Sequence, residues 1–199
     1  MNPFLYFKEC MGRALSRKKT LILFGVLFLL AAVLGMIFVK TPAIYAYHRN
    51  LCDRFIDRVC YSSTSVFVIF LRRWWGHGLL LLLVVIGGIH PATLLVPVAV
   101  LIYRAYTFGG SLVIFFQIYG VSGALVVFVL FLPIHLLIDC VLLFGTALSF
   151  ERCRQFCFSK RDFLCMLGDI VCLFLCIAAV CLVEMVLLLA LFHPIGNIL

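Results

Sequence analysis

Long apolar segments separated by short polar ones set the organisation of this chain. The first apolar segment, residues 20–39, follows the basic stretch "RALSRKK". Its length of about 20 residues is what a bilayer requires of a helix. That is longer than the core of a typical signal peptide, and no convincing A-x-A cleavage site follows it. We expect residues 1–19 to be cytoplasmic and residues 20–39 to be an uncleaved anchor helix.

The next segment, residues 40–77, is the only sizeable polar part of the chain. Within "RNLCDRFIDRVC", Leu51 and Phe55 recur at helical spacing, and the charged residues lie elsewhere on the turn. The pattern predicts a short amphipathic helix on the outer membrane surface. Trp74 and Trp75 are expected to anchor the end of this segment at the headgroup level.

The apolar run that follows is long enough for two spans, and it can be divided in two ways. One division gives spans 75–89 and 92–118, and the other gives 78–103 and 105–119. We prefer the second division because it places Arg104 at the cytoplasmic edge and not within the bilayer. Both divisions give the same number of crossings.

Two further spans complete the prediction. Residues 122–150 form a long helix that Pro133 kinks, and residues 165–192 form the last one, after a basic cytoplasmic loop at 151–164. The chain is therefore predicted to be a single membrane domain, 1–199, of all-α class with about five transmembrane helices. The N-terminus is expected inside and the C-terminus outside. The basic loop agrees with this orientation, whereas the basic residues of the polar segment do not, and we give the first helix precedence.

Composition agrees with a membrane protein. The chain is 66% hydrophobic and 12% charged, with a mean hydropathy of +1.24, and a soluble domain of this size needs more polar surface. The net charge of +8 comes mainly from basic clusters that flank the apolar segments. We interpret these clusters as topology signals and as contacts with anionic lipid headgroups, and we expect no nucleic-acid partner.

Several ionisable residues lie inside predicted spans. His135 and Asp139 are four residues apart, so they share a helix face and can pair. An unpaired carboxylate there costs about 2.5–3.5 kcal/mol on insertion scales, which makes Arg104 a candidate counter-ion. Asp169 and Glu184 lie close to one face of the last helix. These groups either pair internally and fix helix register, or form a proton or ion relay.

Glycines and prolines add a second pattern. Small residues allow helices to approach closely, and prolines bend helices or interrupt them, as in many transporter sites. Close packing is expected at Gly109, Gly110, Gly120 and Gly123, and helix kinks at Pro91, Pro97 and Pro133.

Motifs for catalysis are missing from the sequence. It contains no phosphate-binding loop, no H-E-x-x-H and no nucleophile elbow. Its ten cysteines form no C-x-x-C pair and have no histidines at zinc spacing. We therefore expect no enzyme activity, no metal and no cofactor, and an ATPase that powered transport would have to be a separate subunit.

Three stretches carry a family resemblance: "RKKTLILFGVLFLLAAVLGMIFV", "LIYRAYTFGGSLVIFFQIYGVSGALVVFVLFLP" and "LLLALFHPIGNIL". The chain over residues 18–199 resembles the stage II sporulation protein M family in the order and spacing of these features. Many members are similar to P-H-G-x-x-E-L after the Leu-Pro. Here Ile134 follows Pro133, and His135 and Asp139 keep the spacing one residue later.

The resemblance implies a non-enzymatic scaffold in the mother-cell membrane. Such a scaffold works with a lytic transglycosylase and an amidase that remodel septal peptidoglycan during engulfment, and the segment 40–75 would be its outside docking surface. Some family members resemble transporter subunits. The alternative is therefore an exporter or permease subunit, with a polar relay and a partner ATPase. The sequence leaves open whether copies of the chain form a homo-oligomer.

Overall fold

The computed structural model describes residue 12 and residues 18–60, 66–155 and 160–196, and every regular element within those ranges is helical. In chain order these elements are α2 (Lys18–Phe38), α3 (Pro42–Cys60), α4 (Val66–Gly87), the 3₁₀ turn η1 (Pro91–Thr93), α5 (Leu95–Val126), the π-helical η2 (Val127–Phe131), α6 (Leu132–Gln155) and α7 (Lys160–Gly196).

Five of these helices are long and apolar enough to cross a membrane, which confirms the predicted fold class. The candidate spans are Lys18–Phe38, Phe67–Gly87, Pro91–Val121, Leu132–Cys153 and Met166–Leu187. Helix α3 is the long helix that is not among them. The chain is thus built as a multi-pass membrane protein with one additional amphipathic helix.

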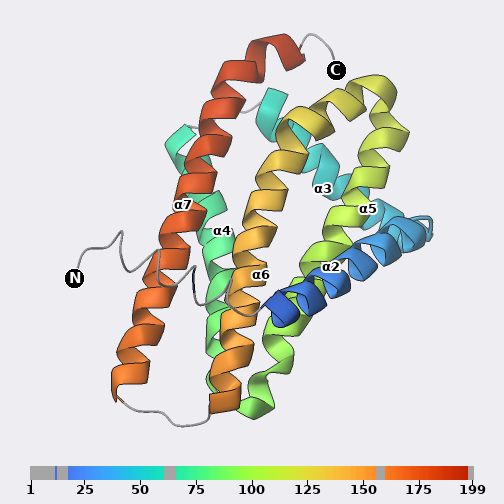
Figure 1. Cartoon of the computed structure of the whole chain (residues 1–199). Coiled ribbons are helices and arrows are strands. Elements are labelled where there is room, and N and C mark those ends of the chain that lie inside the picture. Colours follow the sequence, from blue (N-terminus) through green and yellow to red (C-terminus); the bar gives the residue numbers. More distant parts are fainter. Residues whose placement is uncertain (1–11, 13–17, 61–65, 156–159, 197–199) are drawn as a thin grey trace.

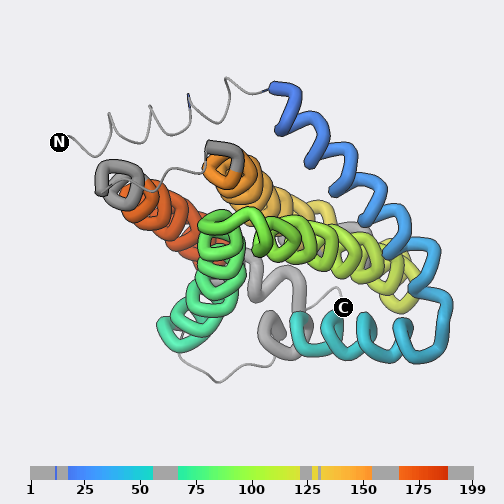
Figure 2. The backbone as a smooth tube through the Cα atoms, turned by 90° about the horizontal axis from the view of Figure 1, so that it is seen from below, coloured from blue at the N-terminus to red at the C-terminus, as the bar shows by residue number. Residues whose placement is uncertain are grey.

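The helices form two groups that share α6. Helices α4, α6 and α7 pack against one another around a core that includes Leu81, Ile138 and Ile177. Helices α2 and α3 each pack against α5, with Phe28 and Phe108 in a second core (Figures 1 and 2). Residues of α6 enter both cores, so this helix joins the two groups.

The preferred division between the second and third spans is wrong. Helix α4 ends at Gly87 and α5 runs without a break past Arg104, so the turn lies between them, near the alternative division. His90 accepts a hydrogen bond from the Ala92 amide at 3.1 Å, and the Thr93 hydroxyl donates to the Gly87 carbonyl at 3.0 Å. The prediction failed because it treated Arg104 as an unpaired charge, whereas this arginine is paired inside the bundle.

Two of the three expected proline kinks, at Pro91 and Pro97, are absent from the structure. Pro91 opens the turn η1, and Pro97 lies in the first turn of α5. The first turn of a helix needs no backbone N–H donor, so neither proline bends a helix. Pro133 differs, because the chain is helical on both sides of it and it lies two residues after the end of the π-helical segment η2, where the regular hydrogen-bond pattern changes.

The predicted helix 122–150 runs through the last turns of α5, the π-helical η2 and α6, and the turn before it lies at Gly120. Gly120 has φ of +55°, which glycine adopts at little cost, and it separates most of α5 from its last turns. Helix α6 then begins at Leu132 and continues to Gln155, beyond the predicted end. Because α7 begins at Lys160, part of the expected loop 151–164 is helical.

The polar segment 40–77 is shorter than predicted. Its amphipathic helix exists as α3, but α4 already begins at Val66, so both tryptophans lie within a candidate span. Trp74 stacks on Phe70, and its Nε1 donates to the Phe174 carbonyl at 3.4 Å. Trp74 is therefore a helix-packing residue of α4 and α7, while Trp75 is 63% exposed on the outer side of α4.

Candidate functional site

Within the described residues, three ion pairs connect the spanning helices, and each buries a carboxylate. The pairs are Arg73 of α4 with Glu184 of α7, Arg104 of α5 with Asp139 of α6, and Arg152 of α6 with Asp169 of α7. The three carboxylate residues are at most 3% exposed. Each carboxylate named from the sequence therefore has its own arginine on a neighbouring helix.

Arg104 lies at the centre of the first polar cluster. Its Nε and Nη2 donate to Asp139 Oδ1 at 3.2 and 3.0 Å, and its Nη2 also donates to His135 Nδ1 at 3.2 Å. Because a guanidinium can only donate, Nδ1 of His135 is an acceptor and the imidazole is neutral, with its proton on Nε2. The His135–Asp139 pair expected from their spacing is thus bridged by Arg104.

Arg73 was missed as a site residue by sequence reasoning. Its Nε donates to Glu184 Oε2 at 3.2 Å and its Nη2 contacts Oε1, so the pair is bidentate. Arg73 falls within residues 40–77, which the sequence predicts to be a polar segment outside the membrane. The signal that could have found it is the apolar sequence on both sides of it, residues 66–71 and 79–86, which together are long enough for one span that contains Arg73.

The pair Arg152–Asp169 lies nearer the opposite end of the bundle. Asp169 is three residues into its candidate span, and Arg152 is close to the end of α6. Arg152 was predicted to lie in a cytoplasmic loop, but α6 extends through it. Asp169 is therefore held by a residue near the helix ends and does not belong to the Arg104 cluster.

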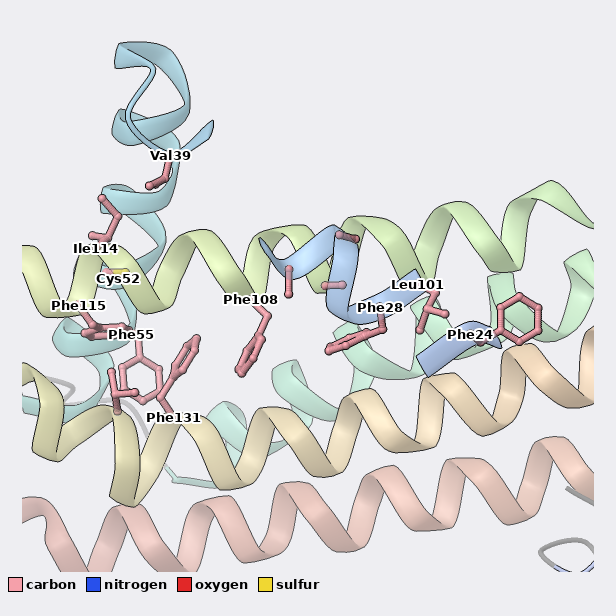
Figure 3. Close-up of a cluster of buried hydrophobic side chains, with 14 of the residues drawn as sticks. Phe24, Phe28, Val39, Cys52, Phe55, Leu101, Phe108, Ile114, Phe115 and Phe131 are labelled. Atoms are coloured by element: carbon pink, nitrogen blue, oxygen red, sulfur yellow. The ribbon is translucent and has the colours of Figure 1, made fainter. Parts of the chain in front are cut away.

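Arg73 and Arg104 face a common cavity of about 120 Å³. Its lining comes from α3, α4, α5, η2 and α6: Leu51, Cys52, Phe55, Arg73, Arg104, Thr107, Phe108, Ser111, Phe115, Phe131 and His135. Figure 3 shows the phenyl rings of this group turned toward one another. The Phe131 ring lies 5.9 Å from that of Phe108, 5.2 Å from that of Phe115, and 4.1 Å from the His135 imidazole.

Helix α3 covers one side of this cavity with its buried face. His48 and Cys52 are at most 1% exposed, and His48 Nδ1 lies 3.4 Å from Ser111 Oγ on α5. Burial lowers the pKa of His48 below its ordinary value, so its imidazole stays neutral. Burial, followed by the charge of Asp53, raises the pKa of Cys52 to about 12, which makes the thiol unreactive.

Two of the four glycines expected in close packing lie at helix contacts. A Cβ on Gly109 would overlap the carbonyl oxygen of Ala32 on α2, and one on Gly110 would overlap the His48 ring. Gly120 has open space around it, so its role is the turn already described. The surroundings of Gly123 lie outside the described part of the chain.

The described residues contain no cluster of side chains that could bind a metal ion. Within residues 18–60, 66–155 and 160–196, no group of three or more His, Cys, Asp or Glu side chains is placed to hold a metal ion. The arrangement is suited to binding a polar ligand, because guanidinium, imidazole and hydroxyl groups line a cavity within an apolar bundle.

Comparison with models of protein families, with curated proteins and with solved structures gives no match to this chain. The resemblance to the stage II sporulation protein M family therefore stays a prediction.

Proposed function

We propose that this chain is a non-enzymatic membrane scaffold that holds extracytoplasmic peptidoglycan hydrolases at the septum of a sporulating cell. The pathway and the partners come from the resemblance in sequence. The observation that supports a scaffold is the position of α3, which packs one face on α5 and exposes the other. The exposed residues of α3 include Tyr47, Arg49, Asn50 and Arg54.

The bundle beneath α3 suits a supporting role. Three buried ion pairs connect α4, α5, α6 and α7, and paired charges on neighbouring helices fix the register between them. A docking helix on such a support keeps its orientation. We therefore expect the partner enzymes to contact the exposed face of α3.

Deletion and charge reversal test this function. Deleting the gene in a spore-forming host is expected to arrest engulfment. The double variant Arg49→Glu/Arg54→Glu is expected to lose co-purification with the wall hydrolases at unchanged protein level, because it reverses two charges on the exposed face. The matched control, Arg49→Lys/Arg54→Lys, keeps the charge and the interaction. Normal engulfment in the deletion strain contradicts the proposal.

A second candidate function is supported by the cavity. Ionisable groups within spanning helices often mark substrate or ion pathways. Arg73, Arg104 and His135 line the cavity described above. Under this alternative the chain is the membrane subunit of an exporter or permease, and a neighbouring gene encodes an ATPase.

Asp139→Asn tests the transport alternative against a matched substitution. Both Asp139→Asn and Asp169→Asn remove a buried carboxylate that pairs with an arginine, but only Asp139 belongs to the Arg104 cluster at the cavity. Transport requires that Asp139→Asn impair export or uptake more than Asp169→Asn does. Equal effects of the two variants contradict a role for this cluster in transport.

A further inference from the structure

The cavity between α3, α4, α5 and α6 is lined by two chemically different kinds of side chain. Guanidinium, imidazole and hydroxyl groups come from Arg73, Arg104, His135, Thr107 and Ser111. Phenyl rings come from Phe55, Phe108, Phe115 and Phe131. A ligand that fits must therefore combine a polar group with an apolar one.

The charges of the polar lining residues favour an anion as the ligand. Arg73 and Arg104 line the cavity, whereas their partners Glu184 and Asp139 are not among the lining residues. Each arginine uses Nε and Nη2 for its carboxylate, and its Nη1 makes no hydrogen bond to the described residues. Two cationic donors are thus available to an acceptor in the cavity, and a bound cation would meet like charge.

Size limits the ligand further. The cavity volume of about 120 Å³ is somewhat smaller than the roughly 150 Å³ of an apolar cavity that holds benzene. The ligand therefore has about six non-hydrogen atoms or fewer. A long acyl chain is too large, and phosphate has no apolar part to contact the phenyl rings.

We propose that this cavity binds a small monocarboxylate with a short aliphatic tail, of the size of propionate or butyrate. Its carboxylate lies at Arg73 and Arg104, and its tail lies against the phenyl rings. This site goes beyond the scaffold function and does not depend on it. Under the transport alternative it names the substrate class.

Calorimetric titration of the full-length chain in phosphatidylcholine nanodiscs tests the ligand class. The probes are acetate, propionate, butyrate, octanoate, butyramide and inorganic phosphate. Butyrate is expected to bind at least about tenfold more tightly than butyramide, which has similar size and no charge, and than octanoate, which is too long. Tighter binding of phosphate, octanoate or butyramide than of butyrate overturns the proposal. So does the absence of butyrate binding up to about 10 mM.

Variants test the location. Arg104→Gln/Asp139→Asn removes a guanidinium and its carboxylate together, so the net charge of the pair stays zero. It is expected to weaken butyrate binding at least about tenfold, because one of the two charged donors is lost. The matched control is Arg72→Gln, which removes an exposed arginine next to Arg73 that does not line the cavity. Equal affinity of both variants overturns the proposed location.

A third variant keeps the test decisive if the double variant does not fold. Leu51→Phe adds bulk at the α3 side of the cavity and leaves both ion pairs intact. It is expected to weaken butyrate binding more than acetate binding, because the longer acid needs the space that the ring fills. An unchanged ratio of the two affinities contradicts binding in this cavity. Because these readouts use purified chain, they stay independent of the engulfment and co-purification tests.

Discussion

Glu184 illustrates, at the scale of a single residue, how an apolar helix carries a charge. It lies three residues before the end of its candidate span, is 1% exposed, and meets two nitrogens of Arg73. Removing two ions from water costs several kcal/mol each, and only close, hydrogen-bonded geometry offsets this cost. The fork of the guanidinium matches both carboxylate oxygens, which a lysine could not do.

A double-mutant cycle on this pair is our first prediction. Arg73→Gln alone leaves a buried unpaired carboxylate and is expected to lower the free energy of unfolding by about 3–5 kcal/mol. Arg73→Gln/Glu184→Gln is expected to cost less than that single change, because neither remaining group is charged. Unfolding in mixed detergent micelles measures both, with Arg72→Gln as an exposed control. A loss in the double variant at least as large as that of Arg73→Gln alone would mean that the two residues are not coupled in this way.

His48 predicts a pH dependence of the packing between α3 and α5. It is fully buried, and its pKa is lowered by burial, so the unfolded chain binds more protons than the folded one below about pH 6.5. Stability from the neutral imidazole is therefore present above pH 6.5 and is lost as the pH falls toward the lowered pKa. Tyr47, Tyr106 and Ser111 contact the ring, and burial raises the pKa of Tyr47 to about 12, far above this range.

The measurement is the thermal unfolding midpoint between pH 7.5 and 5.5. The wild-type midpoint is expected to fall on acidification, and His48→Leu, which has similar volume and no titrating group, is expected to fall less. His90→Leu serves as the control, since His90 is exposed in the turn before α5. Parallel pH profiles for the wild type and His48→Leu would rule out this imidazole as the cause.

At the scale of the helices, hydropathy predicted the existence of each helix better than the boundaries between consecutive helices. The five spans follow from apolar stretches long enough for a bilayer, and α3 follows from its amphipathic spacing. The boundary at Arg104 failed because hydropathy scores an arginine as an isolated charge, while its cost depends on a partner 35 residues away. Trp74 and Trp75 fell within the predicted polar segment for a related reason, since Arg73 beside them is also paired inside the bundle.

The contact between α2 and α5 gives a prediction at this scale. Gly109→Ala places a methyl group against the Ala32 carbonyl, so the two helices must separate. Overpacking of this kind costs about 1–3 kcal/mol, and we expect a lower thermal unfolding midpoint. Gly25→Ala in α2 is the matched control, because no atom lies near its added methyl group. That change is expected to leave the midpoint equal or raise it, as alanine favours a helix. Equal effects of the two substitutions would contradict close packing at Gly109.

At the scale of the whole molecule, the site was only partly predictable from sequence. His135 and Asp139 stood out because four-residue spacing places them on one helix face. The participation of Arg73, Ser111 and Cys52 could not be read in this way, because they come from three different helices that the fold brings together. A cavity is a property of the packing between helices. The pattern of residues along a single sequence does not show which helices pack together, so it carries no direct signal for a cavity.

The orientation of the bundle is the last prediction, and it depends on which end faces outward. Figure 1 places α3 and the start of α4 at one end and the turn η1 at the other. With residues 1–19 inside, α3 lies outside, so Asn50→Cys is expected to react with a membrane-impermeant maleimide in intact cells. Ala92→Cys, exposed at η1, is expected to react only after permeabilisation. Mass spectrometry of each labelled peptide separates these sites from the native cysteines, and buried Cys52 stays unlabelled as an internal control. Labelling of Ala92→Cys in intact cells would invert the topology and place the exposed face of α3 in the cytoplasm, where no wall hydrolase could reach it.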